Sequence, residues 1–450
     1  MVFRKHFEKM KYKNEMVLTD REVDYSLFGA SYFEEWGKFW SEKGIDHGMR
    51  IGLLLNRNQC MMPLLLSLED MVCDIHFLNQ SLESQYVREN RGRFHCLLTD
   101  EAVECPEAVW HKEFHFMGVP FHLYGFAGDT VRGPEGGKRY FYYTSGSTGE
   151  PKACSAGEEN IYWEGLAMMG GLELQKSDRI LSLVPCSHKF GQSVVCIAAA
   201  LAGCKVMYLN GIQTPAGIMK YMQQEKYDAV VLPPMYLELL CGDSAMPVQN
   251  CRYICGGAPL GEKAKGSGRK IINVYGSTET GVIAIRSMDK GKYYAGKAVR
   301  EVEVRCGTQF DTLENRNTYR IEVRSPYTYG GHEKGEYVPT GDYGWLQGDD
   351  IYVCGREDNI INVNGMKVAA AEIEHVLLRH PAVTEARVVK ECEDGREYAH
   401  GYIVGDGSGG LDVEEVFRFC MEHLQPYKVP KKMDVVDKFH YTEMGKRTRI

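Results

Sequence analysis

The stretch formed by residues 143–152, which reads YTSGSTGEPK, constrains the fold more than any other part of this sequence. Its hydroxyl side chains alternate with glycines, and it ends in Pro151 and Lys152. Small residues let backbone N–H groups approach an anion closely, hydroxyls add hydrogen-bond donors, and the lysine adds positive charge. The stretch therefore predicts a phosphate-binding loop. It is not a Walker A loop, because Lys152 does not directly follow Gly149.

Composition limits the class of protein. The 450 residues exceed what one hydrophobic core usually supports, which predicts two or more domains. A formal net charge of -8 argues against nucleic acid as the main partner. The 15 cysteines include no CxxC pair, so we predict neither a zinc ribbon nor a thioredoxin-like motif, and we expect a cytoplasmic protein.

Two further stretches bear on membranes and targeting. Residues 61–66 are apolar, but acidic residues follow them closely, so no membrane span is expected. The basic N-terminal segment, MVFRKHFEKMKYK, lacks the apolar run of a signal peptide, and we expect a loose, solvated arm there.

Short apolar runs alternate with helical patterns between Arg50 and Tyr275. Strands are predicted over residues 50–55, 139–143, 180–184, 206–208, 229–232, 252–255 and 271–275. Helices are predicted over residues 194–201 and 219–226. This alternation favours an α/β fold, and glycine-rich loops follow several of the strands, where open α/β sheets bind ligands.

The pattern changes in the last third of the chain. From about residue 292, short alternating strands predict a small β subdomain. From residue 369, a helix, two strands joined by an acidic turn and a helix over residues 413–423 predict a compact α+β terminal domain. We therefore expect a large N-terminal domain of layered α/β sheets with a small β subdomain, followed by a small C-terminal domain.

Six motifs occur together in one order along the chain. They are YTSGSTGEPK, VYGSTETG (274–281), TGDYGW (340–345), GREDNIINVNGMKV (355–368), LQPYKVP (424–430) and MGKRTR (444–449). In this order they resemble the adenylate-forming superfamily of acyl-CoA synthetases, peptide-synthetase adenylation domains and luciferases. The resemblance covers nearly the whole chain.

The resemblance implies an ATP-dependent, AMP-forming acid–thiol ligase. A carboxylate attacks the α-phosphate of ATP and releases pyrophosphate, and the acyl adenylate then passes its acyl group to a thiol. The implied cofactors are ATP, Mg²⁺ and coenzyme A or phosphopantetheine. Positive charge and a metal ion are needed because two anions meet in the first step.

The resemblance also implies which residues hold the nucleotide. Tyr275 offers an aromatic face to adenine, Thr278 a hydroxyl to the α-phosphate, and Glu279 a carboxylate to Mg²⁺. Asp342 accepts the ribose hydroxyls, and Arg356 contacts ribose or phosphate. The pyrophosphate is expected to lie against the loop residues Thr144, Ser145, Gly146, Ser147, Thr148, Gly149 and Lys152.

Other matching positions concern the acyl group and the second step. Gly257 and Ala258 belong to the segment that passes between adenine and the acyl pocket. Lys446 matches the adenylation lysine, and Gly365 matches a glycine lining the tunnel of the pantetheine thiol. Asp358 matches the hinge of a mobile C-terminal domain, which predicts domains over residues 1–356 and 357–450.

The segment PCSHKFG, residues 185–191, indicates which class of carboxylic acid the enzyme would activate. Amino-acid-activating relatives usually carry an aspartate there, whereas this segment has no carboxylate, so we expect a non-amino acid, fatty or aromatic. His188 matches a histidine at the acyl pocket. Lys189 either faces a second carboxylate of the substrate or points to solvent, and we expect the latter.

The sequence leaves two alternatives for the thiol that accepts the acyl group. We favour coenzyme A, and the alternative is a stand-alone enzyme that loads an acyl carrier protein. A third interpretation, a catalytically dead sensor of acyl nucleotides, is disfavoured by the joint presence of Lys152, Glu279 and Lys446.

Overall fold

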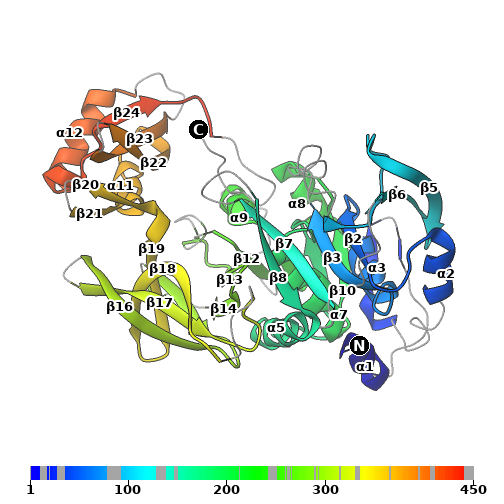
Figure 1. Ribbon diagram of the computed structural model, residues 1–450. Coiled ribbons are helices and arrows are strands. Elements are labelled where there is room, and N and C mark those ends of the chain that lie inside the picture. Colours follow the sequence, from blue (N-terminus) through cyan, green and yellow to red (C-terminus); the bar gives the residue numbers. More distant parts are fainter. Residues whose placement is uncertain are drawn as a thin grey trace.

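The structure of the chain is a computed structural model (Figure 1). It describes residues 2–10, 18–19, 21–27, 36–78, 93–127, 138–145, 151–211, 213–241, 251–258, 260, 264, 266–287, 290–291, 293–313, 316–329, 335–363, 366–393, 396–405 and 411–439.

The largest sheet in this described part of the chain has 12 strands and changes character along its width. Its neighbours from β10 to β13 pair in parallel, and those from β13 to β16 pair antiparallel. In spatial order the strands are β1 (Glu22–Asp24), β10 (Lys205–Tyr208), β9 (Arg179–Ser182), β11 (Ala229–Val231), β12 (Arg252–Gly256), β13 (Lys270–Ser277), β14 (Gly281–Arg286), β15 (Tyr294–Ala298), β19 (Asp350–Arg356), β18 (Val338–Gln347), β17 (Arg316–Arg324) and β16 (Glu303–Leu313).

The parallel half is built from the expected βαβ units. Helix α8 (Pro215–Gln224) connects β10 to β11, and α9 (Pro234–Cys241) leads from β11 towards β12. The α8 helix begins where Thr214 accepts a hydrogen bond from the Gly217 N–H and proline occupies the first helical position, two features that favour a helix start.

A second sheet of 7 strands, counted over the described residues, packs beside the first. It ends in a hairpin, β7–β8, that flanks the glycine-rich stretch. In spatial order the strands are β5 (Ala108–Phe116), β6 (Val119–Phe126), β4 (Cys96–Thr99), β2 (Met49–Leu54), β3 (Val72–Leu78), β7 (Arg139–Ser145) and β8 (Pro151–Gly157).

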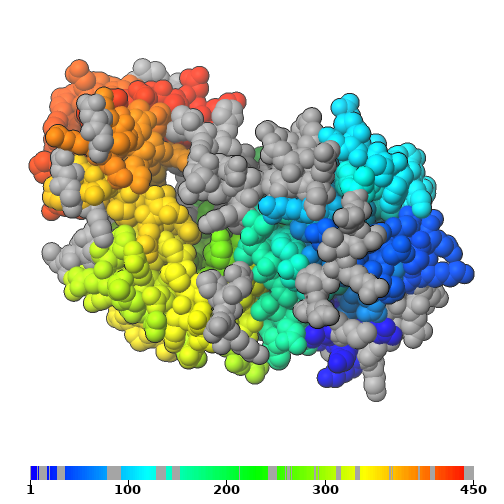
Figure 2. Space-filling model, in the orientation of Figure 1, coloured from blue at the N-terminus to red at the C-terminus, as the bar shows by residue number. Residues whose placement is uncertain are grey.

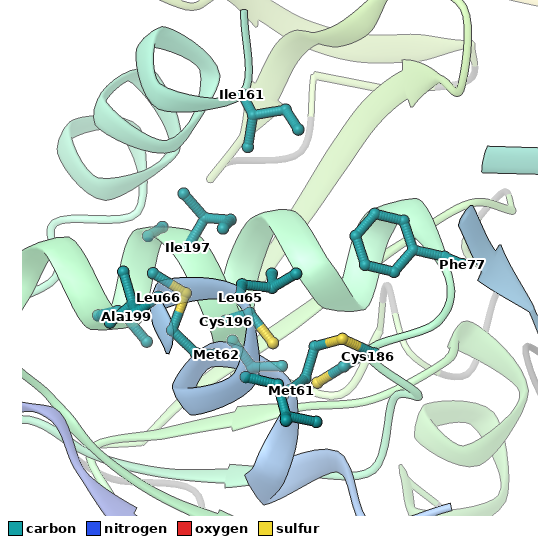
Figure 3. Packing of buried hydrophobic residues seen from close by; sticks show 14 of the residues in the cluster. Met61, Met62, Leu65, Leu66, Phe77, Ile161, Cys186, Cys196, Ile197 and Ala199 are labelled. Atoms are coloured by element: carbon teal, nitrogen blue, oxygen red, sulfur yellow. The ribbon is translucent and has the colours of Figure 1, made fainter. Parts of the chain in front are cut away.

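Helices between the two sheets carry the main hydrophobic core. Figure 3 shows Met61 and Met62 of one helix facing Cys196 and Ile197 of another, with Ile161 above them. The helices and helical turns of this half are η1 (Tyr25–Leu27), α2 (Trp36–Lys43), η3 (Asn58–Cys60), α3 (Met61–Ser67), α5 (Glu158–Gly171), α6 (Lys189–Gly191), the π-helical η6 (Gln192–Ala198) and α7 (Ala199–Ala202).

The expectation of a loose N-terminal arm was wrong. Helix α1 (Val2–Met10) packs against α5, with the side chains of Phe3 and Phe7 buried. The Val2 N–H donates to the Glu158 carboxylate at 2.7 Å, and His6 bonds the Tyr162 hydroxyl at 3.2 Å. Two phenylalanines at helical spacing make one apolar face, which outweighs the basic residues on the other.

The C-terminal elements have a hydrophobic core of their own, formed by residues between 361 and 433. In the space-filling view they appear as an orange and red lobe above the yellow part of the chain (Figure 2). The elements are η7 (Glu357–Asn359), β20 (Ile360–Val363), β21 (Met366–Ala369), α11 (Ala370–Leu377), β22 (Val383–Glu393), β23 (Arg396–Gly405), α12 (Val413–His423), η8 (Pro426–Lys428) and β24 (Lys432–Val435). The predicted fold class is confirmed, while the boundary at residue 357 and the hinge at Asp358 remain predictions.

No helix in the described ranges is both long and apolar enough to cross a lipid bilayer. All 15 cysteines are free thiols, and Cys251 and Cys255 are buried.

Lys189 does not point to solvent, contrary to expectation. Its side chain is 9% exposed and its ammonium forms an ion pair with Glu164 of α5, whose side chain is 3% exposed. Lys189 also donates to the Ser193 hydroxyl at 2.5 Å, and Ser193 donates to Glu164 at 3.1 Å. The hydroxyl of Tyr329 donates to the same carboxylate. Burial lowers the pKa of Lys189, and Glu164 opposes that shift.

A second buried polar group, His76 on β3, lies beside β7, the strand that leads into the glycine-rich stretch, in the same sheet. It is 3% exposed, stacks on Phe141 with ring centroids 4.4 Å apart, and bonds the Tyr143 hydroxyl through Nδ1 at 2.6 Å. Burial, together with the positive charges of Arg50, Arg93 and Arg139, lowers the pKa of His76 to about 3.

We predict that Glu164→Gln destabilises the fold by about 3–5 kcal/mol, because it leaves the Lys189 ammonium buried without a countercharge. The double variant Glu164→Leu/Lys189→Met should recover at least half of that loss, since it removes both charges together. Urea unfolding measures the difference. The control Glu173→Gln, which removes the exposed partner of Lys270, should leave the midpoint unchanged. Losses that simply add in the double variant would contradict a coupled pair.

We predict that His76 makes the fold sensitive to acid. Because the folded pKa is lowered, the stabilisation is fully present above the unfolded pKa of about 6.5 and is lost as pH falls towards 3, at about 1.4 kcal/mol per pH unit. The variant His76→Phe should flatten this pH dependence in urea titrations between about pH 6.5 and 4.5. The exposed control His115→Gln should keep the wild-type slope. An unchanged slope in His76→Phe would refute this assignment.

Candidate active site

Three predicted nucleotide residues meet where β13 faces β18 and β19. The Tyr275 hydroxyl donates to Asp342 Oδ2 at 2.6 Å, and Arg356 Nη1 lies 3.4 Å from Asp342 Oδ1. The antiparallel register of β18 and β19 places Asp342 directly opposite Arg356, so the pair is a consequence of strand pairing. The Asp342 N–H is held in turn by the Thr340 hydroxyl at 3.0 Å.

Burial sets the electrostatics of this cluster. Asp342 is 5% exposed, and burial raises the pKa of its carboxyl, while Arg356 and the Tyr275 hydroxyl lower it. Burial next to Asp342 also raises the pKa of Tyr275 well above its usual value, so the phenol stays protonated as a donor. A shielded carboxylate with an arginine on one oxygen is suited to accepting neutral hydroxyl donors such as those of a ribose.

Thr278 and Glu279 lie on a tight turn between β13 and β14. The Ser277 hydroxyl accepts from the Thr280 N–H at 3.1 Å, which closes the turn. Glu279 is exposed and Thr278 is half-buried. The Tyr329 N–H donates to the Glu279 carbonyl at 2.8 Å, so the turn is tied to the buried Lys189–Glu164 pair through Tyr329.

The described residues of the glycine-rich stretch are the last of β7, up to Ser145, and the first of β8, from Pro151. Thr144 pairs with Lys152 and Ser145 with Pro151 in the backbone register. The thiol of Cys154 on β8 contacts the Thr278 carbonyl at 3.7 Å, so the hairpin and the Ser277–Gly281 turn are neighbours although they are far apart in the sequence. The strand predicted before the stretch is therefore present as β7, while the role of the stretch as a phosphate loop stays a prediction.

The segment of residues 185–191, which is expected to line the acyl pocket, packs against the end of β12. The residues that follow β12 are expected to lie between that pocket and adenine. A Cβ on Gly256 would lie 2.7 Å from the Phe190 ring, so only glycine leaves room for this ring. His188, the residue before α6, is half-buried, and its carbonyl accepts from the Gln192 N–H at 2.9 Å. Gly257 is exposed and Ala258 half-buried just beyond β12.

Several predicted residues cannot be placed in this geometry. Gly146, Ser147, Thr148, Gly149, Gly365 and Lys446 lie outside the described residues, as do the side chains of Thr144, Ser145 and Lys152. Their roles remain predictions.

The polar network around Glu164 was missed from the sequence. Glu164, Ser193 and Tyr329 belong to none of the six motifs, yet they hold Lys189 beside His188 and, through Tyr329, the turn that carries Glu279. The usable signal was the charge of Lys189 next to His188, the histidine matched to the acyl pocket, because Glu164 and Tyr329 lie in other segments of the chain.

The donor set fits a magnesium ion. Mg²⁺ takes one or two protein carboxylates and completes its octahedron with phosphate oxygens and water. Glu279 supplies one exposed carboxylate on the turn next to the phosphate-loop hairpin, which matches that need.

Two models of one enzyme family match this chain. Residues 114–310 match the model of the AMP-binding enzyme family, and residues 372–446 match that of the AMP-binding enzyme C-terminal domain.

Among curated relatives, the 2-succinylbenzoate–CoA ligase of Bacillus licheniformis is 29% identical over 328 residues, covering 68% of each chain. The 2-succinylbenzoate–CoA ligase of Bacillus anthracis is 25% identical over 425 residues, covering 86% of this chain and 84% of its own.

Solved structures share the fold. O-succinylbenzoate coenzyme A synthetase (MenE) from Bacillus subtilis, in complex with ATP and magnesium ion, gives a TM-score of 0.73 at 22% identity, covering 92% of this chain and 91% of its own. ATP-bound MatB from Rhodopseudomonas palustris gives a TM-score of 0.77 at 17% identity, covering 99% and 96%. Because the two family models together match more than half of its residues, this chain belongs to the AMP-binding enzyme family, in the adenylate-forming superfamily.

Proposed function

We propose that this enzyme activates an aromatic carboxylic acid of the 2-succinylbenzoate type with ATP and transfers the acyl group to coenzyme A. The observation that carries the proposal is the cluster of Tyr275, Asp342 and Arg356, which offers a buried carboxylate to a ribose beside the phosphate-loop hairpin. The aromatic acid rests on the names of the curated relatives.

In the first step, a carboxylate oxygen of the acid forms a bond to the α-phosphorus, and the bond to pyrophosphate breaks. Asp342 and Arg356 hold the ribose, and Tyr275 orients Asp342 through its hydroxyl. Thr278 is placed to donate to the α-phosphate. Glu279 would hold a magnesium ion, which would supply positive charge against the negative charge that develops on the phosphates.

In the second step, the thiol sulfur bonds to the acyl carbon, and the bond to AMP breaks. We propose that rotation about Asp358 moves Lys446 away from the adenylate and brings Gly365 to the thiol. Asp358 lies on η7, the short turn that follows β19 and Arg356, so the proposed hinge directly adjoins the ribose contact.

In this proposal Lys189 neither faces a second carboxylate of the substrate nor points to solvent, which are the two alternatives that the sequence offered. Its charge is already balanced by Glu164, so it is not a counter-ion held in reserve for a second carboxylate of the substrate. Instead, the pair positions the segment that contains His188 at the acyl pocket. Recognition of a dicarboxylic acid therefore requires other cations.

We predict that 2-succinylbenzoate gives the highest acid-dependent release of pyrophosphate, with kcat/KM at least about tenfold above that of octanoate, because an aliphatic chain leaves an aromatic pocket incompletely filled. Benzoate serves as a matched acid without the second carboxylate. Product analysis with coenzyme A and with a phosphopantetheinylated carrier protein should give the coenzyme A thioester. Preference for octanoate would contradict the aromatic acid, and preference for the carrier would contradict coenzyme A as acceptor.

We predict that Asp342→Asn raises the KM for ATP by about tenfold or more, since the ribose hydroxyls lose a charged acceptor. The KM for the acid should change much less. Asp350→Asn is a matched control on the same strand pair, because Asp350 bonds Lys290 and Tyr294 away from the cluster. Steady-state pyrophosphate release measures both constants. An equal rise of KM in both variants would argue against a ribose contact.

A further inference from the structure

A second group of metal-binding side chains lies on the β5–β6 hairpin, outside the nucleotide site. His111 and Glu113 are two residues apart on β5 and point to the same face, and His122 of β6 stands directly opposite Glu113. The candidate ligand atoms of the three residues all lie within 4.8 Å of one another. These residues belong to none of the motifs and take no part in the proposed reaction.

The hairpin is remote from the proposed chemistry. β5 is one edge strand of the seven-stranded sheet and β8, which follows the phosphate loop, is the other. Figure 1 shows the cyan β5–β6 hairpin at the opposite end of the molecule from the orange and red C-terminal elements. A ligand bound there would not compete with the nucleotide.

Two distances within the group are close to those between the ligands of one metal ion. His111 Nε2 lies 3.2 Å from His122 Nδ1, and His122 Nδ1 lies 3.6 Å from Glu113 Oε1. Two ligands of a tetrahedral zinc ion, each about 2.0–2.1 Å from the metal, are about 3.3–3.4 Å apart. A metal ion can take the place of the hydrogen bond that joins the imidazole nitrogens of His111 and His122.

The positions of the rings are held by packing rather than by chance contacts at the surface. The His111 ring stacks on Tyr124, with centroids 4.4 Å apart and planes at 6°. Tyr124 is 5% exposed, and its hydroxyl accepts from the Val103 N–H at 3.1 Å. The His122 side chain is 16% exposed. A preorganised ligand loses less conformational entropy on binding.

The other face of β5 anchors the hairpin to the fold. The indole of Trp110 covers Gly125 of β6 so closely that a Cβ there would lie 1.9 Å from the ring. Phe114 and Phe116 are buried in an aromatic cluster with Trp40 of α2. The amine of Lys112 lies over Trp110 on this anchored face, so its positive charge is directed away from the three ligands.

We propose that His111, Glu113 and His122 form a binding site for a divalent transition-metal ion, with Zn²⁺ as the expected ion. Two imidazoles and one carboxylate are a ligand set that zinc accepts, and three protein ligands leave the fourth tetrahedral position to water. Mg²⁺ and Ca²⁺ are disfavoured because they prefer oxygen ligands.

The test is calorimetric titration of ZnCl₂ into the full chain after treatment with a chelator, in the absence of ATP. We expect one saturable site per chain with micromolar or tighter affinity. His111→Gln and His122→Gln should each weaken binding by at least about tenfold. The matched control is His115→Gln, an exposed histidine on the same strand that lies outside the group, and it should bind as the wild type does.

Spectroscopy with Co²⁺ identifies the ligands, since 15 thiols are present in the chain. Tetrahedral d–d bands without a thiolate charge-transfer band support the site, whereas a thiolate band overturns it. Absence of saturable zinc binding, or an equal loss in His115→Gln and His122→Gln, also overturns it. Matching circular dichroism melts of the variants exclude unfolding as the cause. None of these measurements depends on enzymatic activity.

Discussion

The arrangement around the candidate active site depends on the ion pair and hydrogen bonds that the buried carboxylate of Glu164 makes. A charge in a low-dielectric core is tolerated only when hydrogen bonds and an opposite charge surround it. Here the donors come from Lys189 and Ser193, which lie on the consecutive helical elements α6 and η6, and from Tyr329, which lies on a distant segment of the chain. Satisfying one carboxylate thus fixes the acyl-pocket segment against α5 and, through the Tyr329 backbone, the turn that carries Glu279.

The nucleotide cluster arises where the large sheet changes from parallel to antiparallel pairing. Tyr275 lies near the end of β13, the last of the parallel strands, at an irregularity of the β13–β14 pairing. Asp342 and Arg356 come from the antiparallel half, where register sets them opposite one another. The three side chains meet because the end of β13, in the parallel half of the sheet, lies close to the β18–β19 pair of the antiparallel half. This agrees with the general location of ligands at points where strand order changes in α/β sheets.

Much of the fold was predictable because its signals are local. Apolar runs identified the strands of the parallel half, and the helix over residues 413–423 was predicted with the bounds that α12 has. The two errors concern charged residues whose environment is set at a distance. The basic N-terminal segment is a packed helix because Phe3 and Phe7 share a face that fits α5, and Lys189 is buried because Glu164 of that same helix balances its charge.

The sequence by itself determined the family and the reaction type, and it predicted which residues hold the nucleotide, because each motif is a short contiguous pattern with its own chemistry. Only the tertiary structure decided which charges are already balanced and which side chains meet. Glu164 reaches Tyr329 from a distant segment of the chain, and His122 faces Glu113 only through the register of β5 and β6. Such contacts leave no periodic signal, since they depend on strand pairing and core packing between segments that the sequence does not place side by side.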